Sequence, residues 1–413
     1  MSQPLFPAIN LVSGVSGSTK VWSCNGGALG SGTDTNISTP VAAAGVIDNL
    51  KVRVSVAPGT GNTITYTLIK AGVDTAQTCS ISGDALTCSD SANPITFAAS
   101  DTCSIRSQAT AGTPATSNSY VSAAFTGTTD GEALIMGATT SGMPTGATNY
   151  MTIYGTTVAT TTVAAATTTM PTAGVVDKMY IAMSGTPGAG KSYALTLYKN
   201  GLATALTCTV SDAATTCNEP TATVTFAAGD SIAMESVPTG TPTARTLKWG
   251  FRFLPTTNGE SPLFVRDLAP QNSTRYSVII GNSTNIGTES SNQASTSVAF
   301  TLKNLYFAHG YYGAPTGAQT RTLTARKNTA DTGLTATISS AVSFASDLVN
   351  TVDYAVDDLV NFKFTVSGTP PTSALLVYSA TAYIAPAAGG ATSVTPFNLN
   401  GIFNLNGWAN IRN

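Results

Sequence analysis

The chain has 413 residues, of which 19 are basic and 21 acidic, so 10% of it is charged and its formal net charge is −2. Soluble domains usually carry roughly 25% charged residues. The absence of a basic surplus argues against a nucleic-acid partner. No apolar run is long enough for membrane insertion. The chain has a single histidine, His309, which argues against a catalytic triad and against a histidine-rich metal site. We therefore expect neither an enzyme nor a cofactor.

The chain begins with MSQPLFPAINLVSG, which lacks the charged and apolar regions of a secretory signal, so we expect none. We assign residues 1–16 to an N-terminal arm. Its apolar residues Leu5, Phe6 and Ile9 either attach to a partner or pack against the chain's own domains.

A unit of about 128 residues occurs three times in tandem in the sequence. At an offset of 129, residues 45–101 align without a gap with residues 174–230, with 24 identities in 57 positions. A third copy lies 128 residues further on, where LTLYKN at 195–200 aligns with LTARKN at 323–328. Repeats of this length indicate whole domains, which we place at residues 17–130 (module 1), 131–258 (module 2) and 259–386 (module 3).

Within each module, apolar residues alternate with polar ones, as at Leu50, Val52 and Val54 in module 1 and at Trp249 and Phe251 in module 2. Such alternation between turn residues is typical of antiparallel strands with one buried face. We find no sustained helical period. The sequence therefore predicts an all-β chain of three tandem β-sandwiches, each with about eight strands and with the jelly roll as the preferred topology. We expect the three domains to form a row or rod.

Four cysteines occupy equivalent positions in modules 1 and 2: Cys79, Cys88, Cys208 and Cys217. With a turn at Gly83-Asp84, each pair faces across a hairpin at a position that can accept a disulfide. Module 3 replaces both positions together, by Ala336 and Ala345, as a bond predicts. One alternative is that these cysteines are small buried apolar residues without a bond. Another is a metal site, for which two thiolates in each module are too few. Cys24 and Cys103 remain and could pair with each other.

The segment GTPGAGKS at residues 185–192 matches the phosphate-binding loop pattern. That loop requires a helix after it, whereas YALTLYKNG follows here with the alternation of a strand. The equivalent loop of module 1 has Asn62 in place of the lysine. We therefore interpret the segment as a turn between strands.

Residues 387–413 form a C-terminal arm after an Ala- and Gly-rich linker, and they contain the motif FNLNG twice. The apolar residues of this arm are too few to build a core: Phe397, Leu399, Phe403, Leu405 and Trp408. We expect them to attach to a partner by adding a strand or aromatic anchors. The alternative is that the arm folds back on module 3.

The run PGAGKSYALTLYKNG, followed by TCTVSDAATTC, VTFAAGD and SVPTGTP, resembles repeated jelly-roll-like β-sandwich modules in structural proteins of tailed bacteriophage virions. Those modules occur in head decoration proteins, head fibres and tail fibres. The resemblance covers all three modules and carries over no functional residue. It implies a virion surface protein that assembles as a homo-oligomer, with a trimer favoured, and contacts other virion proteins such as the major capsid protein.

A location on a virion also agrees with the cysteines, because disulfides indicate residence outside a reducing cytosol and cell lysis would release the chain without a signal. Two other functions stay open. A tail fibre or other surface array of modules that binds host glycans would need an exposed row of aromatic side chains. A bacterial surface or filament subunit would need a secretion route.

Overall fold

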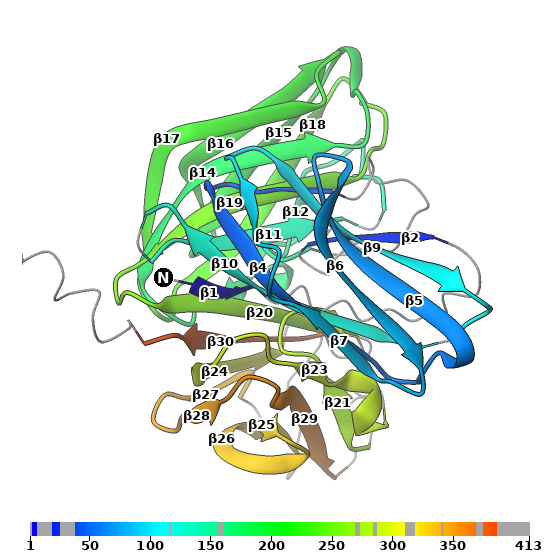
Figure 1. The fold of residues 1–413 in the computed structure, drawn as a ribbon. Helices are drawn as coiled ribbons and strands as arrows, with labels where there is room; N and C mark the ends of the chain where they lie inside the picture. Colours follow the sequence, from blue (N-terminus) through cyan, green and yellow to red (C-terminus); the bar gives the residue numbers. More distant parts are fainter. Residues whose placement is uncertain are drawn as a thin grey trace, which may run out of the picture.

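The computed structural model describes residues 2–5, 19–24, 38–115, 117–129, 131–139, 141–155, 160–268, 273–283, 287–309, 319–339, 342–368 and 375–385. In this part of the chain nearly all regular structure is β-strand. Its helical segments are the short 3-10 turns η2 (Val163–Ala165) and η3 (Glu289–Asn292). The strands form three sandwiches of two sheets each (Figure 1).

Module 1 contains one sheet with the order β1-β10-β4-β7, in which β8 also pairs with β4, and a second with the order β2-β9-β5-β6, in which β3 also pairs with β9. Its strands are β1 (Ser2–Leu5), β2 (Lys20–Ser23), β3 (Thr39–Pro40), β4 (Gly45–Val54), β5 (Gly59–Lys70), β6 (Val73–Gly83), β7 (Thr87–Asp90), β8 (Ile95–Phe97), β9 (Thr102–Ala111) and β10 (Ser119–Gly127).

Module 2 contains the sheets β11-β19-β14-β17 and β12-β18-β15-β16, with β13 paired to β18. Its strands are β11 (Ala133–Ala138), β12 (Asn149–Met151), β13 (Thr168–Thr169), β14 (Gly174–Met183), β15 (Gly188–Lys199), β16 (Leu202–Asp212), β17 (Thr216–Phe226), β18 (Ser231–Thr239) and β19 (Leu247–Pro255). The phosphate-loop-like segment lies at the start of β15, so it is followed by a strand.

Module 3 contains the sheets β22-β20-β30-β24-β27 and β21-β29-β25-β26, with β28 paired to β24 and β23 paired to β29. Its strands are β20 (Glu260–Leu268), β21 (Arg275–Ser277), β22 (Gly281–Ser283), β23 (Ala294–Ser295), β24 (Phe300–His309), β25 (Thr320–Lys327), β26 (Ala330–Ser339), β27 (Phe344–Asp347), β28 (Val352–Tyr354), β29 (Leu359–Ser367) and β30 (Leu375–Tyr383).

The order of the strands is that of a jelly roll in each module. If the eight principal strands of module 2 are counted in chain order, one sheet has the order 1-8-3-6 and the other 2-7-4-5. Modules 1 and 3 repeat these orders with their own strands, and module 3 has the additional strand β22 outside β20. In such a fold the fifth and sixth strands lie in opposite sheets. The prediction of an all-β chain of three tandem sandwiches is confirmed.

The first strand of module 1 lies inside residues 1–16, the segment predicted to be an arm. Strand β1 pairs with β10 in antiparallel register, with Ser2 opposite Thr126 and Leu5 opposite Ala123. Its backbone groups therefore extend the sheet beyond β10, in the position next to the last principal strand that β11 and β20 occupy in the other modules. Module 1 begins at this strand and not at residue 17.

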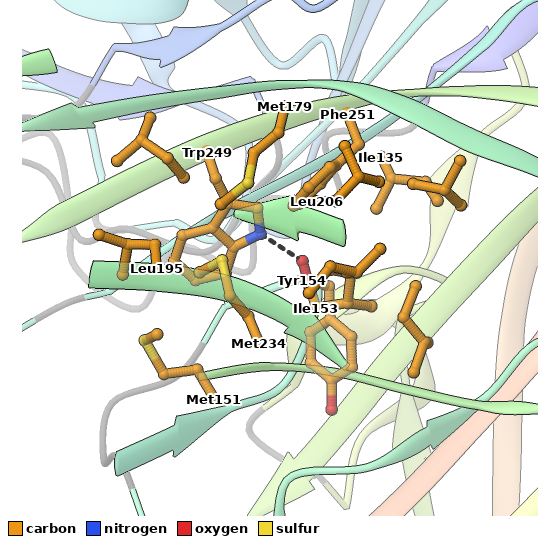
Figure 2. Close-up of a cluster of buried hydrophobic side chains, with 14 of the residues drawn as sticks. Ile135, Met151, Ile153, Tyr154, Met179, Leu195, Leu206, Met234, Trp249 and Phe251 are labelled. Carbon is orange, nitrogen blue, oxygen red and sulfur yellow. Dashed lines mark hydrogen bonds between the residues drawn. The ribbon is translucent and has the colours of Figure 1, made fainter. Parts of the chain in front are cut away.

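Each module has its own buried core, and in module 2 the core surrounds Trp249 (Figure 2). The indole is fully buried, and its Nε1 donates a hydrogen bond to the carbonyl oxygen of Ile153 at 2.6 Å. Met179 and Met234 come from opposite sheets and lie near the ring in Figure 2. Because the polar atom of the indole has a partner, the large side chain can be buried without leaving a donor unsatisfied.

One core position differs between the modules. Gln77 in module 1 is equivalent to Leu206 and Leu334, and all three side chains are 0% exposed. Neither polar atom of the Gln77 amide has a hydrogen-bond partner among the described residues. A buried polar group without a partner lowers stability.

We predict that Gln77→Leu raises the free energy of unfolding of module 1 by about 1–3 kcal/mol, because it removes the unpaired amide. Urea unfolding of the full chain measures the change. The matched control is Leu206→Gln, which places the same amide in module 2 and should be destabilising. An unchanged or lower stability for Gln77→Leu would contradict the prediction.

The three modules close into a ring. The segment around β3 of module 1 packs on β19 of module 2, where a Cβ at Gly250 would collide with the carbonyl oxygen of Pro40. Module 2 reaches module 3 through β13, since the Ser379 hydroxyl of β30 donates to the carbonyl oxygen of Thr169 at 2.6 Å. Module 3 returns to module 1 through β23, whose Ser295 carbonyl accepts from the Ser122 hydroxyl at 2.7 Å.

Corresponding elements form all three contacts. The short strand before the third principal strand of one module (β3, β13 or β23) packs on the last strand of the next module (β19, β30 or β10). The arrangement is therefore head-to-tail with approximate threefold symmetry. Figure 1 shows the sandwiches gathered around a centre, with β1, β10 and β20 near it. The expected row or rod is wrong, because module 3 contacts module 1 as well as module 2.

The contact between modules 1 and 3 carries the most polar interactions. Arg53 is 7% exposed, and its Nη1 donates to the carbonyl oxygens of Ser290 at 2.8 Å and of Gln293 at 3.2 Å. The Lys51 ammonium pairs with the Asp357 carboxylate. Burial lowers the pKa of Arg53 from its usual value, yet the carbonyl partners satisfy the charged group. These bonds close the ring.

Candidate binding edge of module 3

The cysteines predicted to form disulfides are paired in the structure, and they lie at one edge of each sandwich. Cys79 of β6 is bonded to Cys88 of β7, with Cα atoms 5.6 Å apart. In module 2, Cys208 of β16 is bonded to Cys217 of β17, with Cα atoms 5.8 Å apart. Each bond joins the last strand of one sheet to the last strand of the other.

The hairpin predicted around these cysteines is wrong. Strand β6 pairs with β5, whereas β7 pairs with β4 in the opposite sheet. The turn at Gly83-Asp84 therefore passes from one sheet to the other, as the jelly roll requires between its fifth and sixth strands. Cys79 and Cys88 come together across the sandwich and not across a ladder of hydrogen bonds. The disulfide holds the two sheets together at an open edge.

Cys24 and Cys103, for which pairing was the open alternative, are bonded to each other. Cys103 lies on β9, and Cys24 directly follows β2, which pairs with β9. The bond is buried in module 1, where both residues are at most 1% exposed. It closes a stretch of 79 residues in sequence.

The residues predicted to attach to a partner lie outside the described residues: Phe397, Leu399, Phe403, Leu405 and Trp408. Of the described residues, those that suggest a binding surface are instead in module 3. Five large apolar side chains are exposed along its outer edge, with exposed fractions of 42–87%: Val342, Phe344, Leu348, Val349 and Val356. We call this set the apolar edge. The other exposed large apolar residues of the described part are scattered over modules 1 and 2.

The repeats show that the apolar edge belongs to module 3 alone. In the alignment, Phe344 is equivalent to Thr87 and Thr216. The pair Leu348-Val349 is equivalent to Ser91-Ala92 and Pro220-Thr221. Val342 and Val356 each replace an alanine of both other modules. A domain with the same fold thus folds with small or polar residues at these positions, so folding does not require the apolar side chains of module 3.

The turn that carries Leu348 and Val349 has the same backbone geometry as its equivalents. The Asp347 carboxylate accepts the amides of Val349 at 3.1 Å and Asn350 at 3.0 Å, and Asp90 accepts the equivalent amides in module 1. Burial alone would raise the pKa of Asp347, but these bonds and that from the Thr335 amide lower it. The turn is therefore held rigidly, and it presents two apolar side chains to solvent.

A lysine, an aspartate and an aromatic ring cluster beside this edge in module 3 and at the same place in modules 1 and 2. The Lys327 ammonium lies 3.0 Å from the Asp358 carboxylate and 5.9 Å from the centre of the Tyr354 ring. The same carboxylate accepts the Ala355 amide at 2.7 Å. The equivalent ion pairs are Lys70–Asp101 and Lys199–Asp230, both at 3.1 Å. These three equivalent lysine–aspartate ion pairs thus stabilise the same connection between strands in each module.

These aspartates predict a pH dependence. Burial would raise the pKa of Asp358, but bonds from Asn328, the Ala355 amide and Lys327 lower it, and the pKa of Asp230 is lowered in the same way. A carboxylate with a lowered pKa stabilises the fold above its unfolded pKa, and this contribution is lost as the pH falls through the folded value. We expect constant stability from about pH 7 to 5 and a steep loss below about pH 4.

Urea unfolding at a series of pH values measures this profile. The control Asp358→Asn should cost about 1 kcal/mol at neutral pH and should make the acid loss shallower. A chain whose stability rises on acidification would contradict the expectation.

Clusters of metal-ligating side chains and membrane-spanning helices were sought in the described part of the chain. Among those residues no group of three or more His, Cys, Asp or Glu side chains could hold a metal ion. None of the helices found there is long and apolar enough to cross a membrane. The row of exposed aromatic residues that a glycan-binding array would need is not present in the same ranges, where Phe344 is the one largely exposed aromatic side chain.

Comparison with known proteins gives little further information. No family model and no curated protein matches the chain. Among solved structures, the crystal structure of tripeptidyl peptidase 2 aligns with 92% of this chain and 33% of that chain, at 9% sequence identity and a TM-score of 0.19. The chain therefore spans about a third of that peptidase, and so low a score does not indicate a common fold.

Proposed function

We propose that the chain is a non-enzymatic structural protein on the surface of a tailed bacteriophage virion, either a head decoration protein or a head fibre. The observation that carries this proposal is the closed ring of three jelly rolls. A body with approximate threefold symmetry can occupy a symmetric position on a particle, with one module facing each of three equivalent neighbours.

The distribution of charge and cross-links supports the same role. All six cysteines are in disulfides, which suits residence outside a reducing cytosol. Many of the charged side chains form structural pairs, such as the buried network of Arg252 with Asp177 and Glu132 in module 2. A surface with few free charges can make broad contacts at a low cost of desolvation.

The partners in this proposal are the major capsid protein and further copies of the chain, with a trimer favoured. Size-exclusion chromatography with light scattering measures the oligomeric state of the purified chain. Binding to capsids that lack it, followed by sedimentation, measures attachment. A monomer that does not bind such capsids would remove both partners from the proposal.

The decisive experiment is proteomic analysis of purified tailed-phage particles whose genome encodes the chain, with antibody labelling to locate it by electron microscopy. The proposal expects many copies on the outside of each particle. Particles without the chain would overturn it, and so would a purified chain with measurable hydrolytic activity.

A further inference from the structure

The two sheets of module 2 end in edges of different kinds. The last strand of the first sheet, β17, loses its regular register at Pro220, where the Glu219 carboxylate binds the amides of Thr221 at 2.8 Å and Ala222 at 3.0 Å. The last strand of the second sheet, β16, is continuous over 11 residues. Within the described chain no strand pairs with its outer side, and its principal contacts are with strands of its own module. The outer side of β16 is therefore an open edge.

The composition of this edge does not protect it from pairing. Natural proteins often protect the edges of their sheets with charged side chains or proline. Residues 202–211 contain no charged residue and no proline. The side chains on their outer face include Thr207 and Thr209, which are both exposed. Such a strand can lie beside a copy of itself without placing like charges opposite each other.

The repeats show which backbone groups of β16 point outward. In module 1 the Thr78 amide donates to the Asp90 carboxylate of the opposite sheet at 2.9 Å, and module 3 repeats this bond. The amide therefore points away from the neighbouring strand of its own sheet. Thr207 is the equivalent residue of module 2, where Glu219 stands in place of the aspartate and binds its own turn instead. The carboxylate that closes the edge in modules 1 and 3 thus does not close it in module 2.

The outward groups of β16 are complementary to themselves. Alternate residues point their backbone groups to the same side, so those of Thr207, Thr209 and Ser211 point outward, and β16 is regular against β15 over these residues. An antiparallel pair about a twofold axis at Thr209 joins the Thr209 groups of two copies by two hydrogen bonds. The Ser211 amide of each copy then reaches the Thr207 carbonyl oxygen of the other. The Ser211 carbonyl oxygen already accepts the Ala214 amide at 2.9 Å, and its second lone pair can accept the Thr207 amide.

The side chains match in the same register. It places Thr209 opposite Thr209 and Thr207 opposite Ser211, and such hydroxyl pairs already join neighbouring strands, as Thr196 and Thr207 do at 3.0 Å. In modules 1 and 3 the carboxylate bound to the outward amide occupies the place of the added strand. We infer that β16 pairs with β16 of a second copy of the chain. Because the contact is twofold and module 2 alone offers this edge, the assembly closes as a dimer. This inference does not depend on the proposed function.

Analytical ultracentrifugation of the intact chain from about 1 µM to 1 mM tests the inference. We expect monomers and dimers in proportions that depend on concentration. Because the twofold axis places Thr209 opposite itself, Thr209→Lys and Thr209→Asp should each weaken dimerisation about tenfold through the repulsion of like charges. An equal mixture of the two variants should restore it as a mixed dimer.

The matched control is Ser80→Lys, the same change at the equivalent position of module 1, where Asp90 closes the edge. It should leave dimerisation unchanged. A chain that stays monomeric at about 1 mM would overturn the inference, and so would a dimer that both Thr209 variants retain. A trimer would also overturn it, while agreeing with the assembly favoured in the proposed function.

A second variant tests the role of the missing carboxylate. Glu219→Asp, Pro220→Ser and Ala222→Asn together introduce the residues that module 1 has at these positions. The new aspartate should bind the Thr207 amide, as Asp90 binds its equivalent, and abolish the dimer. Hydrogen exchange in the core strands measures whether the fold is kept. A folded variant that dimerises as well as the unsubstituted chain would contradict the assignment of the contact to this edge.

Discussion

Replacing Cys24 and Cys103 together by alanine is expected to lower the free energy of unfolding of module 1 by about 4–5 kcal/mol. The bond closes a stretch of 79 residues, and its removal returns the corresponding loop entropy to the unfolded chain. Both sites are buried and apolar, so alanine introduces no unpaired polar group. Urea unfolding measures the loss.

The matched comparison is the pair Cys208→Ala and Cys217→Ala in module 2, whose bond closes only 9 residues and should contribute about 2–3 kcal/mol. Module 3 has no cysteine among residues 259–386. A reducing agent should therefore accelerate hydrogen exchange in the core of module 1 most and in that of module 3 least. Equal losses for the two double variants would contradict this order.

Trp249→Ala is expected to destabilise module 2 by about 3–5 kcal/mol. The substitution removes the largest side chain of that core, leaves a cavity between the sheets and deprives the Ile153 carbonyl oxygen of its donor. The close approach of Gly137 to the indole shows that the backbone has been shaped around this ring, so the surrounding strands cannot readily collapse into the space.

Trp249→Phe provides the control, because it keeps an aromatic ring and should cost less than alanine. Thermal unfolding of the chain measures both variants. A loss below about 1 kcal/mol for Trp249→Ala would show that the cavity collapses and would contradict the packing described for module 2.

The sequence alone was sufficient to predict the sandwiches, because the alternation of residues such as Leu50 and Val52 and the threefold repeat are local signals. The pairing of Cys79 with Cys88 was also predictable from their joint loss in module 3. Their geometry was not, since a short turn between two strands suits a hairpin as well as a passage between sheets. Only the pairing of both strands with other partners distinguishes the two.

The closure of the ring and the apolar edge depend on tertiary contacts that no local pattern reports. Strand β1 lies in a segment for which the sequence predicts an arm, because four residues carry no periodic signal. The apolar edge did have a signal, since Leu348 and Val349 replace small or polar residues of the other modules. Without the fold, however, nothing showed that these residues lie together with Phe344 at an open side of a sheet.

Linking the three modules in one chain changes how the ring responds to dilution. In a trimer of separate subunits the contacts weaken as the protein is diluted, whereas here each module meets the next at an effective concentration on the order of millimolar, set by the short connections. The ring can therefore persist at any concentration of the chain. Covalent linkage also allows the three contacts to differ in sequence. The pair of Lys51 with Asp357 is such a difference, because module 2 has Tyr180 at the position of Lys51.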